Sequence, residues 1–134
     1  MGAGVRLLDV STEHAKSWQS FGQIISTWPS VRAALADMAI DIHAARLMVY
    51  HAAWKADEGE DIHQEAAMAK VFATEMLYRV AARAVQIKGG PAPARELPIE
   101  VLCQNIVARG AGQRALEVQK AIVTGDVLNL GTII

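Results

Sequence analysis

Histidine is the residue type in this chain most suited to holding a metal ion. His43, His51 and His63 fall within or beside two long segments with helical periodicity. A di-metal site in a helical bundle needs inward-facing carboxylates and a Glu-x-x-His motif on each of two facing helices. Only Glu60-Asp-Ile-His63 has this spacing, and it lies at a predicted turn. We therefore expect no metal site.

Two further features could carry chemistry. Cys103 has no identifiable base partner in the sequence, so we interpret it as a small buried hydrophobic residue. Gly89-Gly90 could let backbone N–H groups approach a phosphate, but a glycine pair after a helix more often simply ends the helix. The acidic run Glu58–Asp61 is typical of a solvated turn before a helix. These residues alone define no reaction.

Composition limits the kind of protein that has to position these residues. The 134 residues are 52% hydrophobic and 20% charged with a net charge of −1, which predicts one folded domain over residues 1–134. The single cysteine excludes a disulfide framework. There is no basic block for nucleic acid and no apolar run of the roughly 18 residues that a membrane span needs. The N-terminal residues lack a signal-peptide pattern, so we expect a cytoplasmic location.

The sequence predicts an all-α fold. It contains 24 alanines, which favour helices, and no window has the strict polar–apolar alternation of a half-buried strand. The first predicted helix runs from about Val5 to Trp18 and is closed by Phe21-Gly22. The second runs from Pro29 to a turn at 56–61, and the third from Asp61 to Gly89-Gly90. After a loop at 91–98, a short helix from Ile99 to about Ala108 and a last one from Gln113 to Leu128 complete the chain. Two long antiparallel helices with flanking ones predict an up-and-down four-helix bundle with a short extra helix.

Both long helices carry an apolar stripe that should form the core. The predicted inner positions are Leu7, Leu8, Ser11 and Ala15 in the first helix, Val31, Leu35, Met38, Ile42, Ala45, Val49 and Ala52 in the second, and Ile62, Ala66, Ala69, Ala73, Met76, Val80 and Ile87 in the third. Further apolar residues lie off these stripes: Leu47, Met48 and Tyr50, and Val71, Phe72 and Leu77. One core would not bury them all, so we expect a second packing surface, most simply another subunit.

The order of several short motifs resembles the C-terminal domain of acyl-CoA dehydrogenases. The motifs are Ala15-Lys16, Ser20-Phe21-Gly22, Leu35-Ala-Asp-Met-Ala39, Ala44-Ala-Arg-Leu47, Ala52-Ala-Trp54, Glu65-Ala-Ala-Met-Ala-Lys70, Ala84-Val-Gln-Ile-Lys-Gly-Gly90, Glu96-Leu-Pro-Ile-Glu100 and Glu117-Val-Gln119. The resemblance covers nearly the whole chain. It implies the helical domain that helps to bind FAD and to assemble a homo-oligomer, a dimer or a tetramer. It also implies that the preceding helical and β-domains of the family are absent.

The resemblance implies cofactor-binding roles for particular residues. Phe21 would contact flavin, while Gln86, Gly89 and Gly90 would approach the FAD of a neighbouring subunit. Glu117 lies at another cofactor-binding position of the family. The enzymes abstract the α-proton of an acyl-CoA thioester with a glutamate while flavin accepts a hydride from the β-carbon.

This sequence departs from the family at functional positions. Trp18 stands where relatives have an arginine that pairs with the FAD pyrophosphate. Counting back from Glu117 places Gln113 at the position of the catalytic glutamate, and Arg114 replaces a glycine. An amide has no useful basicity, so no catalytic residue is assigned.

Three hypotheses follow for function. In the first, the chain is an isolated bundle that self-associates, catalyses no dehydrogenation by itself and does not bind FAD alone. Alternatively, it is one subunit of a split FAD-dependent acyl-CoA dehydrogenase, completed by a partner chain. It could also be a redesigned scaffold in which Trp18 and Trp28 add packing.

Overall fold

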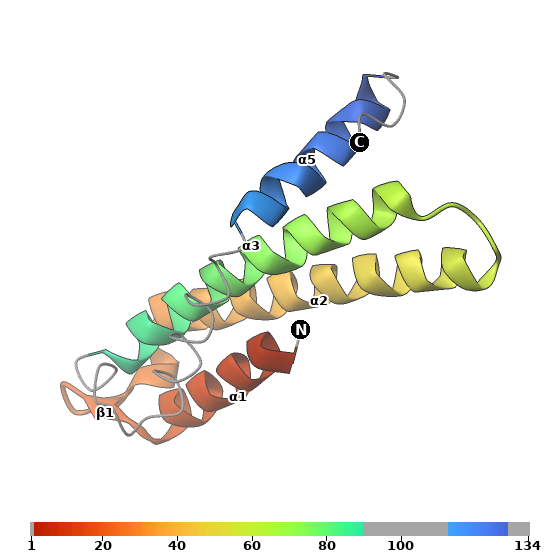
Figure 1. Cartoon of the computed structure of the whole chain (residues 1–134). Coiled ribbons are helices and arrows are strands. Elements are labelled where there is room, and N and C mark those ends of the chain that lie inside the picture. Colours follow the sequence, from red (N-terminus) through yellow and green to blue (C-terminus); the bar gives the residue numbers. More distant parts are fainter. Residues whose placement is uncertain (1, 90–112, 129–134) are drawn as a thin grey trace.

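The structure is a computed structural model that describes residues 2–89 and 113–128. Its helices are α1 (Gly2–Ser17), α2 (Pro29–Asp57), α3 (His63–Lys88) and α5 (Gln113–Val127). Figure 1 shows α2 and α3 as a long antiparallel pair, with α1 on one side and α5 against α3 on the other. The predicted all-α bundle is confirmed. The predicted loop at 91–98 and short helix at 99–108 lie outside the described residues.

Local sequence signals set the ends of the long helices. Pro29 is the first residue of α2, where its missing N–H would have had no helical partner. The helix continues to Asp57, two residues into the predicted turn. The N-cap residue of α3 is Ile62 and not the predicted Asp61, but Asp61 Oδ1 still accepts a hydrogen bond of 3.1 Å from the backbone N–H of His63, the first residue of the helix. Gly89 ends α3 with a φ of 67°, a conformation that suits glycine.

The core lies where α1 crosses α2 and α3. It is formed by apolar side chains from all three helices and from the short 3₁₀ turn η1 (Ile25–Thr27): Leu7, Ala15, Ile25, Met38, Ile42, Ala45, Met76, Val80, Ala81, Ala84 and Ile87. Eight of the eighteen predicted stripe positions are among them, and four more, Leu8, Val31, Leu35 and Ala73, are partly buried against this core. In the described ranges, none of the helices has the length and hydropathy that crossing a bilayer requires.

Two predicted core positions are wrong. Val49 is 36% exposed, and Ala66 is also exposed. The cause is the limited reach of α1, whose Gly4 lies against Ile42 and Met76, so that α1 leaves the far halves of α2 and α3 uncovered (Figure 1). Periodicity identifies the face of a helix but not the length over which a neighbour covers it.

The apolar residues off the stripes divide into two groups. Leu47 and Tyr50 are 55% and 61% exposed, as a second packing surface on α2 requires. On α3, in contrast, Phe72 and Leu77 pack against the same core as α1 and α2. The prediction of a second surface is therefore wrong for these two residues.

A small hairpin replaces the simple helix ending predicted at Phe21-Gly22. Strands β1 (Gln19–Ser20) and β2 (Gln23–Ile24) pair antiparallel, with Gln19 opposite Ile24. Phe21 and Gly22 form the turn with φ of 50° and 77°, the positive values that suit a tight hairpin. Strands of two residues are too short for an alternation pattern, so they could not be predicted from the sequence.

Candidate functional site

Phe21 stands at the tip of the hairpin and is 96% exposed. Its ring stacks on Trp28, with the centroids 6.2 Å apart and the planes at 26°. Trp28 precedes α2 and packs against the core, so it supports the Phe21 ring from the protein side. The arrangement presents an aromatic surface that a planar ligand could contact.

Hydrogen bonds fix this hairpin to the bundle. The Ile25 backbone N–H donates to the Trp18 carbonyl at 3.0 Å, which closes the base of the hairpin. Thr27 Oγ1 donates to the Ile24 carbonyl at 2.7 Å, and Arg32 Nε donates to the Ser26 carbonyl at 2.8 Å. Ile25 is 5% exposed and anchors the segment in the core. The position of Phe21 therefore follows from the packing of α1 and α2.

Trp18 lies beside the hairpin and stacks on His14, with the ring centroids 5.3 Å apart. Burial lowers the pKa of His14, and the positive charge of Lys88 lowers it further. Lys88 belongs to the last turn of α3, so this effect indicates that the ends of α1 and α3 lie near each other. Sequence reasoning missed His14 and Lys88, although the four-residue spacing of His14 and Trp18 places both on one helix face.

Gln86 and Gly89 lie at the same end of the bundle as Phe21. Gln86 is exposed in the last turn of α3, and the Gly89 N–H donates to the Val85 carbonyl at 3.0 Å. Figure 1 shows the end of α3 beside the hairpin. Four of the predicted site residues, Trp18, Phe21, Gln86 and Gly89, thus gather at one end, while Gly90 lies outside the described residues.

Glu117 is not part of this group. It is exposed on α5, which lies on the opposite side of α3 from α1 (Figure 1). Lys120 Nζ on α5 pairs with Glu75 Oε1 on α3 at 2.6 Å, which fixes α5 along the middle of α3. Gln113 is the first residue of α5. Within one chain, the backbone of Gln113 and the hairpin end are therefore separate.

The histidines are dispersed. His43 and His51 are exposed on α2, and His63 Nδ1 lies 2.6 Å from Asp61 Oδ1 at the start of α3. Across residues 2–89 and 113–128, no three His, Cys, Asp or Glu side chains gather as a metal site. Cys103 lies outside this part of the chain.

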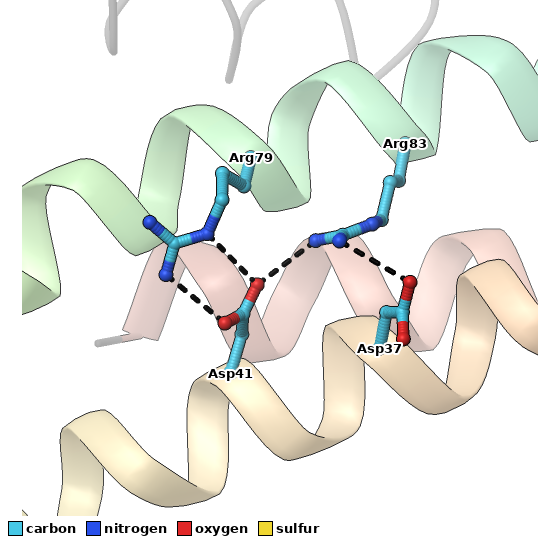
Figure 2. Close-up of polar contacts among 4 residues, drawn as sticks. All are labelled: Asp37, Asp41, Arg79 and Arg83. Carbon is cyan, nitrogen blue, oxygen red and sulfur yellow. Dashed lines mark hydrogen bonds and ion pairs between the residues drawn. The ribbon is translucent and has the colours of Figure 1, made fainter.

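An ionic cluster that the sequence analysis missed joins α2 to α3. Asp41 accepts two hydrogen bonds from Arg79, of 3.0 and 3.2 Å, and one of 2.8 Å from Arg83 (Figure 2). Arg83 also donates to Asp37 at 3.2 Å. The two arginines lower the pKa of Asp41, mainly through the hydrogen bonds of Arg79. The sequence signal that could have indicated this cluster is the four-residue spacing of the two aspartates and of the two arginines, which places each pair on one face of its helix.

Comparison with known proteins agrees with this fold. Residues 1–128 match the family model "Acyl-CoA dehydrogenase, C-terminal domain". "Probable acyl-CoA dehydrogenase YngJ" of Bacillus subtilis (strain 168) is 36% identical over 128 residues, which are 96% of this chain and 34% of that protein. The helical bundle is thus a dehydrogenase C-terminal domain, and the chain belongs to the acyl-CoA dehydrogenase family.

Solved structures show the same relationship. Butyryl-CoA dehydrogenase of Megasphaera elsdenii is 33% identical with a TM-score of 0.89, covering 95% of this chain and 33% of that one. The FAD complex of PigA is 32% identical with a TM-score of 0.87, covering 96% of this chain and 33% of that one. The chain therefore spans about a third of the length of these relatives.

Proposed function

We propose that these 134 residues form the self-associating helical domain of an FAD-dependent acyl-CoA dehydrogenase, and that they do not dehydrogenate a substrate by themselves. Two observations support the second part. The chain matches about a third of its relatives' length. The residue at the position of the family's glutamate base is Gln113, whose amide cannot accept the α-proton.

One observation carries self-association. α2 displays a row of apolar side chains away from the core, and Ile40, Leu47, Tyr50 and Trp54 are 66%, 55%, 61% and 55% exposed. His43 and His51 lie between these residues on α2. We call the surface formed by all six residues the outer α2 face. A contiguous apolar row of this kind on a helix is typical of an interaction surface.

The hairpin end fits one wall of a flavin site. Phe21 offers an exposed ring, and a Cβ added at Gly22 or Gly89 would meet no atom within 4 Å, so space for a ligand is open at both glycines. Trp18 cannot supply the positive charge that pairs with the pyrophosphate in relatives. Flavin bound in the family accepts the hydride from the substrate β-carbon. We propose that Phe21, Gln86, Gly89 and Gly90 contact FAD only when other protein segments complete the site. Glu117 would contribute from a different side of α3.

A partner chain is the second candidate for completing that site. The observation that favours it is the same exposed Phe21 ring, which nothing in the described part of the chain covers from the solvent side. In this arrangement the present chain is one subunit of a split acyl-CoA dehydrogenase. The partner would supply the remaining two thirds of the enzyme.

A dye-reduction assay separates these proposals. The purified 134-residue protein, with added FAD and acyl-CoA, should not reduce an artificial electron acceptor, and Gln113→Glu should not create activity. Acyl-CoA-dependent dye reduction by the chain alone would contradict the proposal. If activity appears only after mixing with a polypeptide that carries the upstream two thirds of a relative such as YngJ, the split-enzyme arrangement is supported.

A further inference from the structure

Lys88 is a partly buried lysine that has no anionic partner among the residues the structure describes. Lys16, Lys55 and Lys120 each pair with a glutamate, at 3.5, 2.6 and 2.6 Å, and Lys70 is exposed to water. Withdrawing an ammonium group from water costs free energy unless an anion compensates for the lost hydration. The surroundings of Lys88 therefore suit an anion that the described part of the chain does not itself supply.

Packing places Lys88 at the hairpin end of the bundle. Its neighbour in α3, Ile87, is 7% exposed and shares the core with Ala15 of α1, which is fully buried. The last turns of α1 and α3 therefore lie near each other, and the charge of Lys88 acts on His14. His14 in turn stacks on Trp18, which begins the hairpin segment. Figure 1 shows the end of α3 beside the hairpin.

The hairpin end carries an excess of positive charge. Residues 14–32 and 85–89 form the hairpin and the helix turns beside it, and they contain no aspartate or glutamate. Their lysine and arginine side chains are those of Lys16, Arg32 and Lys88. Lys16 is bonded to a glutamate of its own helix, and Arg32 donates to a backbone carbonyl at 2.8 Å. Of these three cations, Lys88 is the one without a described partner.

An anion bound at this end needs a fixed cation beside it. Both α1 and α3 end here, and the free carbonyl groups at the C-terminus of a helix carry a partial negative charge that repels anions. His14 does not supply the cation, because burial and then the charge of Lys88 lower its pKa and leave the imidazole neutral at pH 7. The Trp18 indole is uncharged as well, so the positive charge has to come from Lys88.

We propose that Lys88 binds the diphosphate bridge of FAD in this chain, and so supplies the positive charge that Trp18 lacks. The inference rests on the proposed flavin contact of the hairpin end and adds the residue that compensates the charge of the phosphates. It also accounts for an aromatic side chain at position 18, since the charge comes from α3 instead.

The residues around Lys88 suit this role. Gly89 follows it with a φ of 67°, and a Cβ added there would meet no atom within 4 Å, so a ligand can approach the backbone closely. Gln86 lies in the same turn of α3 and is exposed. The ammonium group provides three donors on a flexible stem, and the Gln86 amide provides two more. Residues 86–89 therefore combine hydrogen-bond donors, a positive charge and open space, which a diphosphate requires.

Binding of inorganic pyrophosphate to the isotope-labelled chain, followed by NMR chemical shifts, tests this role. The chain supplies one wall of the site, so we expect weak but saturable binding, with the largest shifts at the Gly89 amide and the Trp18 indole. Sodium sulfate at equal ionic strength corrects for screening. Lys88→Met should weaken binding roughly fivefold, because it removes a charge-assisted hydrogen bond, whereas Lys88→Arg should retain it.

Lys16→Met is the matched control. It removes the same charge at the same end of the bundle, but Lys16 is bonded to Glu13, so the affinity for pyrophosphate should change by less than about twofold. Equal weakening in Lys16→Met and Lys88→Met would show a general attraction of anions to this end and would overturn the inference.

A compensating substitution separates the role of Lys88 from an effect on folding. Trp18→Arg in the Lys88→Met background returns a positive charge to the hairpin end, so it should restore the affinity to within about twofold of the original. Circular dichroism reports whether each variant is folded, and Lys88→Gln replaces Lys88→Met if the latter does not fold. An affinity that stays low in the folded double variant shows that the charge at this end is not what matters, and overturns the inference.

The outcomes for the inference and for the proposed function are distinguishable. Undiminished binding in Lys88→Met, or no saturable binding by the original chain, overturns the inference alone. Dye reduction by the chain alone overturns the proposed function, and the pyrophosphate titration still tests Lys88 because it requires no turnover.

Discussion

Among individual residues, Ser11 is a buried residue whose hydroxyl group lacks the hydrogen bond that a buried polar group normally makes. Its side chain is fully buried on the inner face of α1, and its Oγ has no hydrogen-bond partner. A hydroxyl without a partner costs free energy because it loses its bonds to water. Helical periodicity placed Ser11 on the inner face correctly, but no sequence pattern shows whether a buried hydroxyl finds an acceptor.

Replacing this hydroxyl should stabilise the fold. We expect Ser11→Ala to raise the free energy of unfolding by about 1 kcal/mol, since it removes an unsatisfied group and places a good helix former in α1. Urea denaturation followed by circular dichroism measures the change. Ser17→Ala is the control: Ser17 is exposed and bonds to the Glu13 carbonyl at 3.0 Å, so its replacement should change stability by less than about 0.5 kcal/mol. A loss of stability in Ser11→Ala would contradict this account of the buried hydroxyl.

At the scale of whole helices, Asp41 makes the main ionic contact between α2 and α3. Its side chain is 18% exposed and is bonded to Arg79 and Arg83 from the facing helix. We expect Asp41→Asn to lower the free energy of unfolding by about 1–2 kcal/mol at pH 7, because both arginines lose their charged acceptor. Asp37→Asn is the matched control, since Asp37 is 56% exposed and should matter by less than about 1 kcal/mol.

The contribution of Asp41 should depend on pH. The pKa of its carboxyl is lowered in the folded protein, chiefly by the Arg79 hydrogen bonds, so its stabilising effect is complete above the unfolded-state pKa of about 3.9. The effect is lost as the pH falls from there through the lowered folded-state pKa. Denaturation at pH 7, 4 and 2.5 should show the difference between the original chain and Asp41→Asn shrinking with acidification. If the difference in free energy of unfolding grew as the pH fell, the pKa of Asp41 would be raised in the folded protein, contrary to this account.

The end of α3 depends on the backbone of Gly89. At a φ of 67° and ψ of −146°, any side chain would strain the backbone, even though a Cβ there meets no atom within 4 Å. Gly89→Ala should therefore cost about 1–2 kcal/mol in thermal or urea unfolding. Gly2→Ala is the control, because Gly2 is helical and has open space around its Cα. A neutral Gly89→Ala would show that the α3 ending tolerates a side chain.

The predicted elements show which signals can be read from sequence. Pro29, Asp61 and Gly89 act through their own backbone or side-chain chemistry, so the helix ends that depend on them could be predicted. The exposure of Val49 could not, because it depends on where α1 ends in space. The ionic cluster at Asp41 and the electrostatic effect of Lys88 on His14 depend on which turns of two helices face each other. The gathering of Trp18, Phe21, Gln86 and Gly89 at one end could be expected only from the family resemblance.

For the whole molecule, the outer α2 face is the apolar surface that residues 2–89 and 113–128 leave exposed. α1 and α3 cover the opposite side of α2, and α5 packs on α3. A second copy would bury Ile40, Leu47, Tyr50 and Trp54 without any change in the bundle. A charge in the middle of this row should prevent that pairing, because an unpaired carboxylate is costly to bury.

The mass of the protein in solution tests this central claim most directly. Size-exclusion chromatography with light scattering at pH 8 should give the original chain a mass of at least twice 14.4 kDa, and Leu47→Glu a mass of 14.4 kDa with unchanged helical content. The account would be contradicted if the original chain stayed at 14.4 kDa at all concentrations, or if Leu47→Glu assembled as well as the original.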